Sequence, residues 1–417
     1  MSDSQPRAAR LSRNPDFLKL WSGETVSQFG SLISGVAIPF AAILTLDAAP
    51  FQMALLRSAG IGAGILTVLF VGVWVDRMRR RPIMIATDLG QAILLATVPI
   101  ASVAGVLKMA HLYAVTFAAG LLSSFFDVAY RSYLPSIVER DDLVEANSKL
   151  SASSSVAEVG AFAMAGWLVQ WLTAPFAILI DALSFAFSAL CVMNIKRPEP
   201  APAPPARRSP IAREIAEGAR FVWGHPMLRA LLLCAAATSF SFGVTSIVYM
   251  LFVVNTLGFK PGLLGMIFSV GGASSLGGAI VATGAARRFG AGRSMVFGLV
   301  IWGVGSILVP LAHGATLPAG ALLVAQQLIG DGGATIYLIN ATSIRQMIAP
   351  PEILGRVSAS LRFIGLASAL AGSIAGGAIG QLLGLRFALV VGACGPFVAA
   401  AALWPTVRAL ERESDRT

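Results

Sequence analysis

Charged residues are scarce in this sequence. Asp, Glu, Lys and Arg make up 12% of its 417 residues, whereas a typical soluble domain contains about 25%. Hydrophobic residues make up 56% of the chain. A soluble globular protein is therefore not expected.

Cysteine and histidine are also rare, with three of each. Cys191, Cys234 and Cys394 lie far apart within apolar segments and show no metal-ligand spacing. The glycine-rich stretch "GGASSLGG" lacks the Lys-Ser/Thr ending of a phosphate-binding loop. We therefore expect no metal and no cofactor, and we expect an ion gradient to supply the energy for any transport.

Long apolar runs recur along nearly the whole chain. A helix of about 20 apolar residues crosses the hydrocarbon core of a membrane. The runs, read with the turn and charge signals between them, predict an all-α integral membrane protein with twelve transmembrane helices in two sets of six. The predicted helices are 22–46, 51–75, 82–106, 111–133, 148–172 and 175–195, then 228–256, 262–286, 293–312, 317–345, 354–382 and 386–408.

Basic residues are unevenly distributed between the two ends of these helices. If the N-terminus is cytoplasmic, all but four of the 31 Lys and Arg residues lie on the cytoplasmic side. The four exceptions are Arg57, Lys108, Lys260 and Arg386. The positive-inside rule then predicts that both termini are cytoplasmic. The net charge of +10 reports this orientation, and no nucleic-acid partner is expected.

A proline-rich segment, "KRPEPAPAPPARRSP" at 196–210, separates the two sets of helices and predicts an extended linker. The residues that follow place Ile211, Ile215, Ala219 and Val222 on one helical stripe, which predicts an amphipathic helix at the inner membrane surface. The expected domains are an N-terminal bundle at 1–195, a cytoplasmic linker with this helix at 196–226, and a C-terminal bundle at 227–417.

Four motifs resemble those of a known family. The loop "GVWVDRMRRRP" after the second helix resembles the loop signature of the major facilitator superfamily. The segments "FFDVAYRSYLPSIVERDDLVEANSKL" (125–150), "LIDALSFAFSAL" (179–190) and "SIRQMIAPPEILGRVSASLRF" (343–363) resemble the branch that contains macrolide and siderophore exporters. The resemblance covers essentially the whole chain. It is specific to the branch and not to a substrate.

This resemblance implies a function. We expect a monomeric secondary transporter in the bacterial inner membrane, which exports amphipathic small molecules by alternating access in exchange for protons and is surrounded by membrane lipid. An uncoupled facilitator or a lipid flippase of the same fold remains an alternative. An enzyme is not expected, because the acid in "GDGGATIYLINATSIR" (330–345) has no second acid or histidine three or four residues away.

The resemblance also implies a gating motif. In the family, the loop aspartate meets the N-terminus of helix 11, where the helix dipole favours an anion, so Asp76 is expected near Gly355. Asp127 is then a partner of Arg80 or Arg81. A local pair between Asp127 and Arg131, four residues apart on one helix, is an equally weighted alternative. The residues assigned to the gating motif are Gly72, Asp76, Arg77, Arg80, Arg81, Asp127, Arg131, Gly355 and Arg356.

Two acids fall near the predicted membrane midplane, Glu158 in helix 5 and Asp331 in helix 10. A carboxylate at that depth costs several kcal/mol unless it is protonated, paired or in contact with water. Both are therefore candidates for proton coupling. Glu24, in the inner third of helix 1, is a further candidate.

Asp331 is the favoured candidate. The resemblance implies that helix 10 lines the substrate cavity. The neighbouring glycines, Gly330, Gly332 and Gly333, are expected to leave room for water or ligand beside the carboxylate.

The predicted topology can be tested by cysteine labelling. In a variant without native cysteines, a cysteine at Ala203 should react with a membrane-impermeant reagent only from the cytoplasmic side. A cysteine at Ala49 should react only from the opposite side. Labelling of both positions from one side would contradict the topology.

Overall fold

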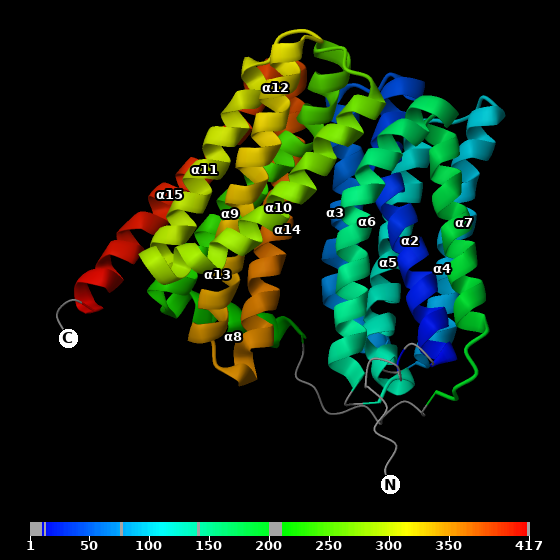
Figure 1. Ribbon diagram of the computed structural model, residues 1–417, viewed down its shortest axis with the longest axis horizontal. Helices are drawn as coiled ribbons and strands as arrows, with labels where there is room; N and C mark the ends of the chain where they lie inside the picture. The colour runs from blue at the N-terminus through cyan, green and yellow to red at the C-terminus, as the bar shows by residue number, and fades with distance from the viewer. Residues whose placement is uncertain (1–10, 12–13, 76–77, 140–141, 200–210, 415–417) are drawn as a thin grey trace. The chain divides into compact units, whose positions relative to one another are not determined.

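The computed structural model describes all residues except 1–10, 12–13, 76–77, 140–141, 200–210 and 415–417, and contains no strand in the part it describes (Figure 1). Eleven helical spans of the described residues are long and apolar enough to cross a membrane. A further long helix, α3 (Pro50–Val75), has 26 residues and is also strongly apolar. The predicted all-α membrane fold is confirmed, with close to the predicted number of helices.

The chain forms two compact units. The first comprises Met1–Asp47 and Gly62–Arg207. Its helices are α2 (Pro15–Phe40), continued by a π-helical segment (Ala41–Thr45), the later part of α3, α4 (Arg80–Val103), α5 (Met109–Ile137), α6 (Leu143–Leu172) and α7 (Ala174–Met193). Within this unit, α7 packs extensively against both α2 and α4.

The second unit comprises Ala48–Ile61 and Arg208–Thr417. Its helices are the early part of α3, α8 (Ile211–Gly224), α9 (Pro226–Leu251) with the π-helical Phe252–Thr256, α10 (Pro261–Phe289), α11 (Ala291–Leu311), α12 (Leu317–Gln326), the π-helical Gln327–Asp331, α13 (Gly332–Ile348), α14 (Pro351–Leu382) and α15 (Leu385–Ser414). The largest packing surfaces of this unit join α9 to α14 and to α15.

The first helix starts earlier than predicted. It begins at Pro15 and not at residue 22, because the Asn14 side chain accepts hydrogen bonds from the backbone N–H groups of Asp16 (3.1 Å) and Phe17 (3.2 Å). Such a cap satisfies N–H groups that have no partner within the helix. The polar residues of this stretch therefore belong to the first turns of α2.

The helix α8 lies where the sequence predicts an amphipathic helix, and its predicted apolar stripe is only partly buried. Val222 is fully buried in the core of the second unit, whereas Ala219 is exposed. Gly218 faces the Arg356 carbonyl of α14 so closely that a Cβ there would lie within 3 Å of backbone atoms. The helix thus packs on the protein through Gly218 and Val222, because a residue without a side chain lets α8 approach α14.

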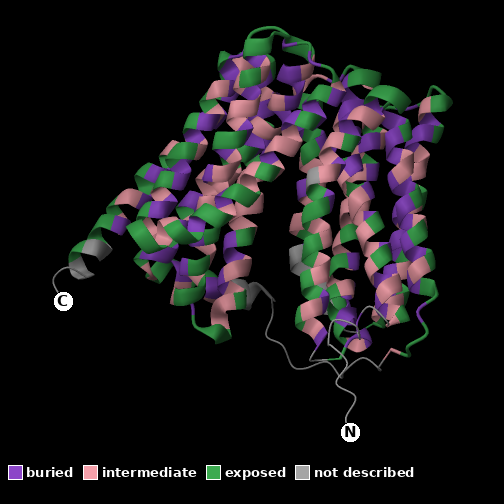
Figure 2. Cartoon of the chain, in the orientation of Figure 1, coloured by how far each residue is buried: buried purple, intermediate pink, exposed green. Residues whose placement is uncertain are grey.

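Many large apolar side chains remain exposed on the surfaces of the long helices (Figure 2). Ile93, Ile280 and Leu382 are 68%, 80% and 82% exposed. Soluble monomers rarely expose contiguous apolar surfaces of this extent. Lipid chains are the environment in which such surfaces are stable.

Close packing of α9 and α14 depends on glycine. A Cβ on Gly376 of α14 would lie 2.7 Å from Val244 Cα, and one on Gly372 would lie 2.8 Å from the carbonyl carbon of Phe240. Small residues at a membrane helix interface allow the two backbones to approach each other. These glycines therefore set the distance between the two helices.

We expect Gly376→Ala to destabilise the protein by about 1–3 kcal/mol, because the added methyl group overpacks this contact. Gly277→Ala in α10 is the matched control, since no heavy atom lies within 4 Å of its Cβ position. The control should be neutral or slightly stabilising. Thermal unfolding of the purified variants in detergent measures both effects, and equal Tm values would contradict the packing argument.

Candidate functional site

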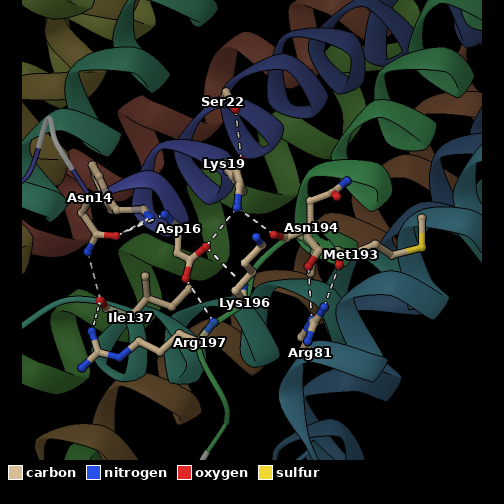
Figure 3. Close-up of polar contacts among 12 residues, drawn as sticks. Asn14, Asp16, Lys19, Ser22, Arg81, Ile137, Met193, Asn194, Lys196 and Arg197 are labelled. Atoms are coloured by element: carbon tan, nitrogen blue, oxygen red, sulfur yellow. Dashed lines mark hydrogen bonds and ion pairs between the residues drawn. The ribbon is translucent and has the colours of Figure 1, made fainter.

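Polar side chains close the helix ends at one end of the first unit (Figure 3). The Arg81 guanidinium donates hydrogen bonds to the carbonyl oxygens of Val192 (3.2 Å) and Met193 (2.7 Å), and the Lys19 ammonium donates to that of Asn194 (2.7 Å). The last carbonyls of a helix lack partners within it and attract cations. Arg81 and Lys19 thus cap the C-terminal end of α7.

The first residues of the linker are bound at the same end. Asp16 accepts hydrogen bonds from the backbone N–H groups of Lys196 (3.2 Å) and Arg197 (3.0 Å), and it pairs with Lys19 (3.1 Å). The Arg197 guanidinium donates to the Ile137 carbonyl at the end of α5 (2.5 Å). The linker is therefore attached to α2 and α5 before it reaches residue 200.

Glu199 binds the start of α4. Its carboxylate accepts hydrogen bonds from the backbone N–H groups of Arg80 (2.5 Å) and Arg81 (3.2 Å), and it lies 3.8 Å from the Arg80 guanidinium. The Glu199 side chain is only 6% exposed. A helix N-terminus is a favourable site for an anion. The sequence analysis did not identify this contact.

The gating-motif prediction is only partly covered by the structure. Asp76 and Arg77 lie outside the described residues, and Gly72 lies within α3. The described contacts of Arg80 and Arg81 join them to Glu199 and to the end of α7, which the prediction did not include. The partner of Asp127 stays a prediction.

In the second unit, Arg356 of α14 pairs with Glu217 of α8 at 2.7 Å. Both side chains are more than a third exposed, so the pair contributes at most about 1 kcal/mol. The predicted contact of Gly355 with Asp76 stays a prediction, because Asp76 lies outside the described residues.

Three acids come together inside the first unit. Glu24 of α2 interacts electrostatically with Asp127 of α5, with Asp88 of α4 and with Arg131 of α5. The Tyr130 hydroxyl, which interacts with the same Glu24, is buried and makes no hydrogen bond with the described residues. The structure thus joins Glu24, which is a coupling candidate, with Asp88 and with two gating-motif residues, Asp127 and Arg131.

Glu158 does not belong to this cluster. It lies on α6, it is exposed, and it is absent from the electrostatic neighbours of Glu24. Its proposed coupling role remains a prediction.

Asp331 lies where the tenth predicted helix changes its hydrogen-bond pattern, at the end of the π-helical segment between α12 and α13. Its carboxylate faces Gly271 of α10, beside the Gln327 amide, and it interacts electrostatically with Tyr249 of α9. The Tyr249 hydroxyl is buried without a hydrogen-bond partner among the described residues. π-Helical turns are often found at functional sites.

The glycines next to Asp331 do not leave the open space that the sequence analysis predicts. A Cβ on Gly298 of α11 would lie 2.7 Å from the Gly333 carbonyl oxygen, and one on Gly278 of α10 would lie 2.6 Å from that of Gly332. Gly330 likewise faces Gly305 of α11. The expected room for water or ligand at these positions is filled by α10 and α11, because glycine pairs permit backbone contact.

Two buried acids were not among the site candidates of the sequence analysis. Asp88 and Asp181 are 0% and 1% exposed. The signal that could have identified Asp181 is its spacing from Ser184 and Ser188, which places all three on one face of a helix. Asp88 carries no comparable local signal.

A family model described as "Major Facilitator Superfamily" matches residues 20–291. The chain belongs to the Major Facilitator Superfamily. Members of this superfamily are transporters, and the eleven apolar spans agree with a multi-pass membrane protein.

Two bacterial relatives in the superfamily match along most of their length. The chain is 22% identical over 382 residues to the uncharacterized MFS-type transporter YfiS of Bacillus subtilis (strain 168), with 90% of this chain and 89% of the relative covered. It is 25% identical over 387 residues to the multidrug efflux pump Tap of Mycolicibacterium fortuitum, with 90% and 91% covered.

Solved transporter structures share the fold. A mutant of the nucleoside transporter NupG aligns with a TM-score of 0.77 at 14% identity, covering 94% of this chain and 99% of that one. A bacterial homologue of the iron transporter ferroportin in the inward-facing state aligns with a TM-score of 0.75 at 18% identity, covering 94% and 98%. At these identities the likeness shows the fold alone.

The contact between Glu199 and α4 can be tested by substitution. Glu199→Ala should lower the stability of the purified protein by about 0.5–2 kcal/mol, because two N–H groups at the start of α4 lose their acceptor. Glu199→Gln is the matched control: it keeps an acceptor oxygen and should lose less. An alanine variant that unfolds at the same temperature as the wild type would show that this carboxylate does not stabilise α4.

Proposed function

We propose that this superfamily member exports amphipathic small molecules, of a drug-like, macrolide-like or siderophore-like class, across the bacterial inner membrane in exchange for protons. The observation that carries the proposal is the cluster of Asp88, Asp127 and Arg131 around Glu24. The proposal includes cytoplasmic termini and a monomer surrounded by lipid as the working unit.

The cluster supports proton exchange for an electrostatic reason. Glu24 has two further carboxyl groups among its electrostatic neighbours, and part of the cluster is buried, since Asp88 is 0% exposed. Buried charges without partners are unfavourable by several kcal/mol. Carboxyl groups in this position bind protons and can release them when their surroundings change, which is what proton coupling requires.

Asp331 provides a second coupling candidate in the other unit. It lies at an irregular turn of a long helix, close to the Gln327 amide and to Tyr249. Irregular backbone at membrane depth occurs where protein or a water-filled cavity surrounds it. The division of the chain into two helical units agrees with the alternating-access mechanism of secondary transporters.

Export as the direction of transport is supported by the relative Tap, whose name describes a multidrug efflux pump. The alignment covers most of both chains, so the similarity extends over both units. An uncoupled facilitator or a lipid flippase of the same fold is the competing proposal.

Proton coupling can be tested with Asp331→Asn, Glu158→Gln and Glu24→Gln by measuring the uptake of a fluorescent amphipathic dye into inverted membrane vesicles. We expect a coupling residue, once neutralised, to lose proton-driven transport, because no proton is then bound and released in the cycle. The same variant should keep counterflow, which needs no gradient.

The wild type provides the decisive control. Transport that is unchanged when the proton gradient is dissipated would contradict antiport and favour the facilitator or flippase. Full proton-driven transport in all three variants would show that none of these carboxyl groups carries the coupled proton.

A further inference from the structure

A polar face runs along α7 inside the first unit. Asp181, Ser184 and Ser188 follow one another at spacings of three and four residues, which places them on one side of the helix. This side faces α2: a Cβ on Gly30 would lie 2.6 Å from an Asp181 carboxylate oxygen, and one on Gly23 would lie 3.3 Å from the Ser188 hydroxyl. The two glycines make room for the polar side chains between α2 and α7.

Asp181 lies at one end of this face. Its carboxylate accepts a hydrogen bond from the Ser184 hydroxyl (3.1 Å), and Ser34 of α2 lies beside it. Asp181 is 1% exposed. No Lys or Arg of the described residues is among the groups that act on this carboxyl group.

Asp88 reaches the other end of the face from α4. It is 0% exposed, and Ser188 of α7 lies beside its carboxylate. Neither the Asp88 oxygens nor the Ser188 hydroxyl make a hydrogen bond of normal geometry with the described part of the chain. Asp88 also acts on Glu24, so this end of the face adjoins the acid cluster.

The charged groups around the face do not neutralise its two acids. From α2 the neighbouring charge is Glu24, which is itself acidic, and from α5 the cluster around Glu24 adds Asp127 and Arg131. An ionised carboxylate buried without a cation costs several kcal/mol. Burial therefore favours the neutral, protonated form of Asp88 and of Asp181.

A purely structural hydrogen-bond network would pair these atoms with one another. Leaving a buried polar group unpaired costs about 1–3 kcal/mol, and native interiors contain few such groups. Among the described residues, the Asp88 oxygens and the hydroxyls of Ser188 and Ser34 make no hydrogen bond of normal geometry. A protonated acid can pass its proton to a neighbouring group when that group has a free hydrogen-bond donor and acceptor.

We propose that Asp88 and Asp181 are proton-binding groups of a relay along α7, which runs through Ser188 and Ser184 and connects the Glu24 cluster with the opposite part of the helix. The inference rests on the proton coupling in the proposed function. It assigns the proton path to the interior of the first unit.

Proton transfer along this relay leaves the number of bound protons unchanged. A carboxyl group gives its proton to the neighbouring hydroxyl oxygen, and that hydroxyl passes its own proton to the next group, so each serine ends unchanged. Each acid then takes up a new proton from the other direction, and one proton leaves for each that enters. Ser184 and Ser188 lie about 6 Å apart along the helix axis, so the step between them requires a water molecule or a rotation of the side chains.

Infrared spectroscopy of the purified protein tests the bound protons directly. A protonated carboxylic acid has a C=O stretching band distinct from that of a carboxylate, and Asp88→Asn and Asp181→Asn should each remove one such band. Asp16→Asn is the matched control, because Asp16 pairs with Lys19 and its substitution should remove none. A wild-type spectrum without these bands would overturn the proposal.

Transport assays test the relay. Asp88→Asn, Asp181→Asn and Ser184→Ala should each slow proton-driven dye transport by about tenfold or more, because a step of proton transfer is lost, while counterflow is retained. Ser155→Ala, on the exposed surface of α6, should have no effect. The serine variant keeps both acids, so it tests the relay even if an asparagine variant folds poorly.

The outcomes separate the relay from the proposed function. A wild type without proton-driven transport overturns the antiport, and the relay with it, before any variant is made. Wild-type coupling together with full proton-driven transport in Asp88→Asn, Asp181→Asn and Ser184→Ala overturns the relay alone.

Discussion

Hydrocarbon offers no hydrogen-bond partner to a polar group, so every polar group at membrane depth must find its partner within the protein. The backbone meets this requirement by forming helices in both units. The helix ends still carry unpaired N–H and C=O groups. Arg81 and Lys19 supply donors to the last carbonyls of α7, and Glu199 supplies acceptors to the first N–H groups of α4. Arg81, Lys19 and Glu199 are therefore structural parts of the bundle.

The same constraint shapes the helix interfaces. Apolar side chains gain little when they leave lipid for a helix interface. Close packing of the helix backbones therefore contributes more to helix association. Gly376 and Gly372 bring α14 onto α9, and the glycines around Asp331 bring α10 and α11 onto the irregular tenth span. At that span the Ser274 hydroxyl donates to the Leu328 carbonyl (2.6 Å), in the π-helical segment. This hydrogen bond stabilises the π-helical segment from within the unit.

Several buried acids lie close to other polar groups inside the first unit. Glu24 has Asp88, Asp127 and Arg131 among its electrostatic neighbours, while Ser34 and Ser184 are the polar groups of the described residues that act on Asp181. A buried acid is more stable when it holds a proton, and protons are what the proposed antiporter exchanges. The stability cost of these acids and the proposed function thus have the same physical origin. In the second unit, Asp331 lies at the π-helical segment of the tenth predicted helix.

The sequence by itself determined the fold class, the position of nearly every long helix and the family, because hydrophobicity, helical period and loop motifs are local properties of the chain. It also identified Glu158 and Asp331 as acids of interest from their depth, and it named Glu24 as a further candidate. Only the tertiary structure decided which groups meet. Asp88 joins Glu24, and Glu199 binds α4, through contacts between residues far apart in the chain. The glycines beside Asp331 pack against helices and leave no open space, because the approach of α10 and α11 is a property of the folded unit that no single segment encodes.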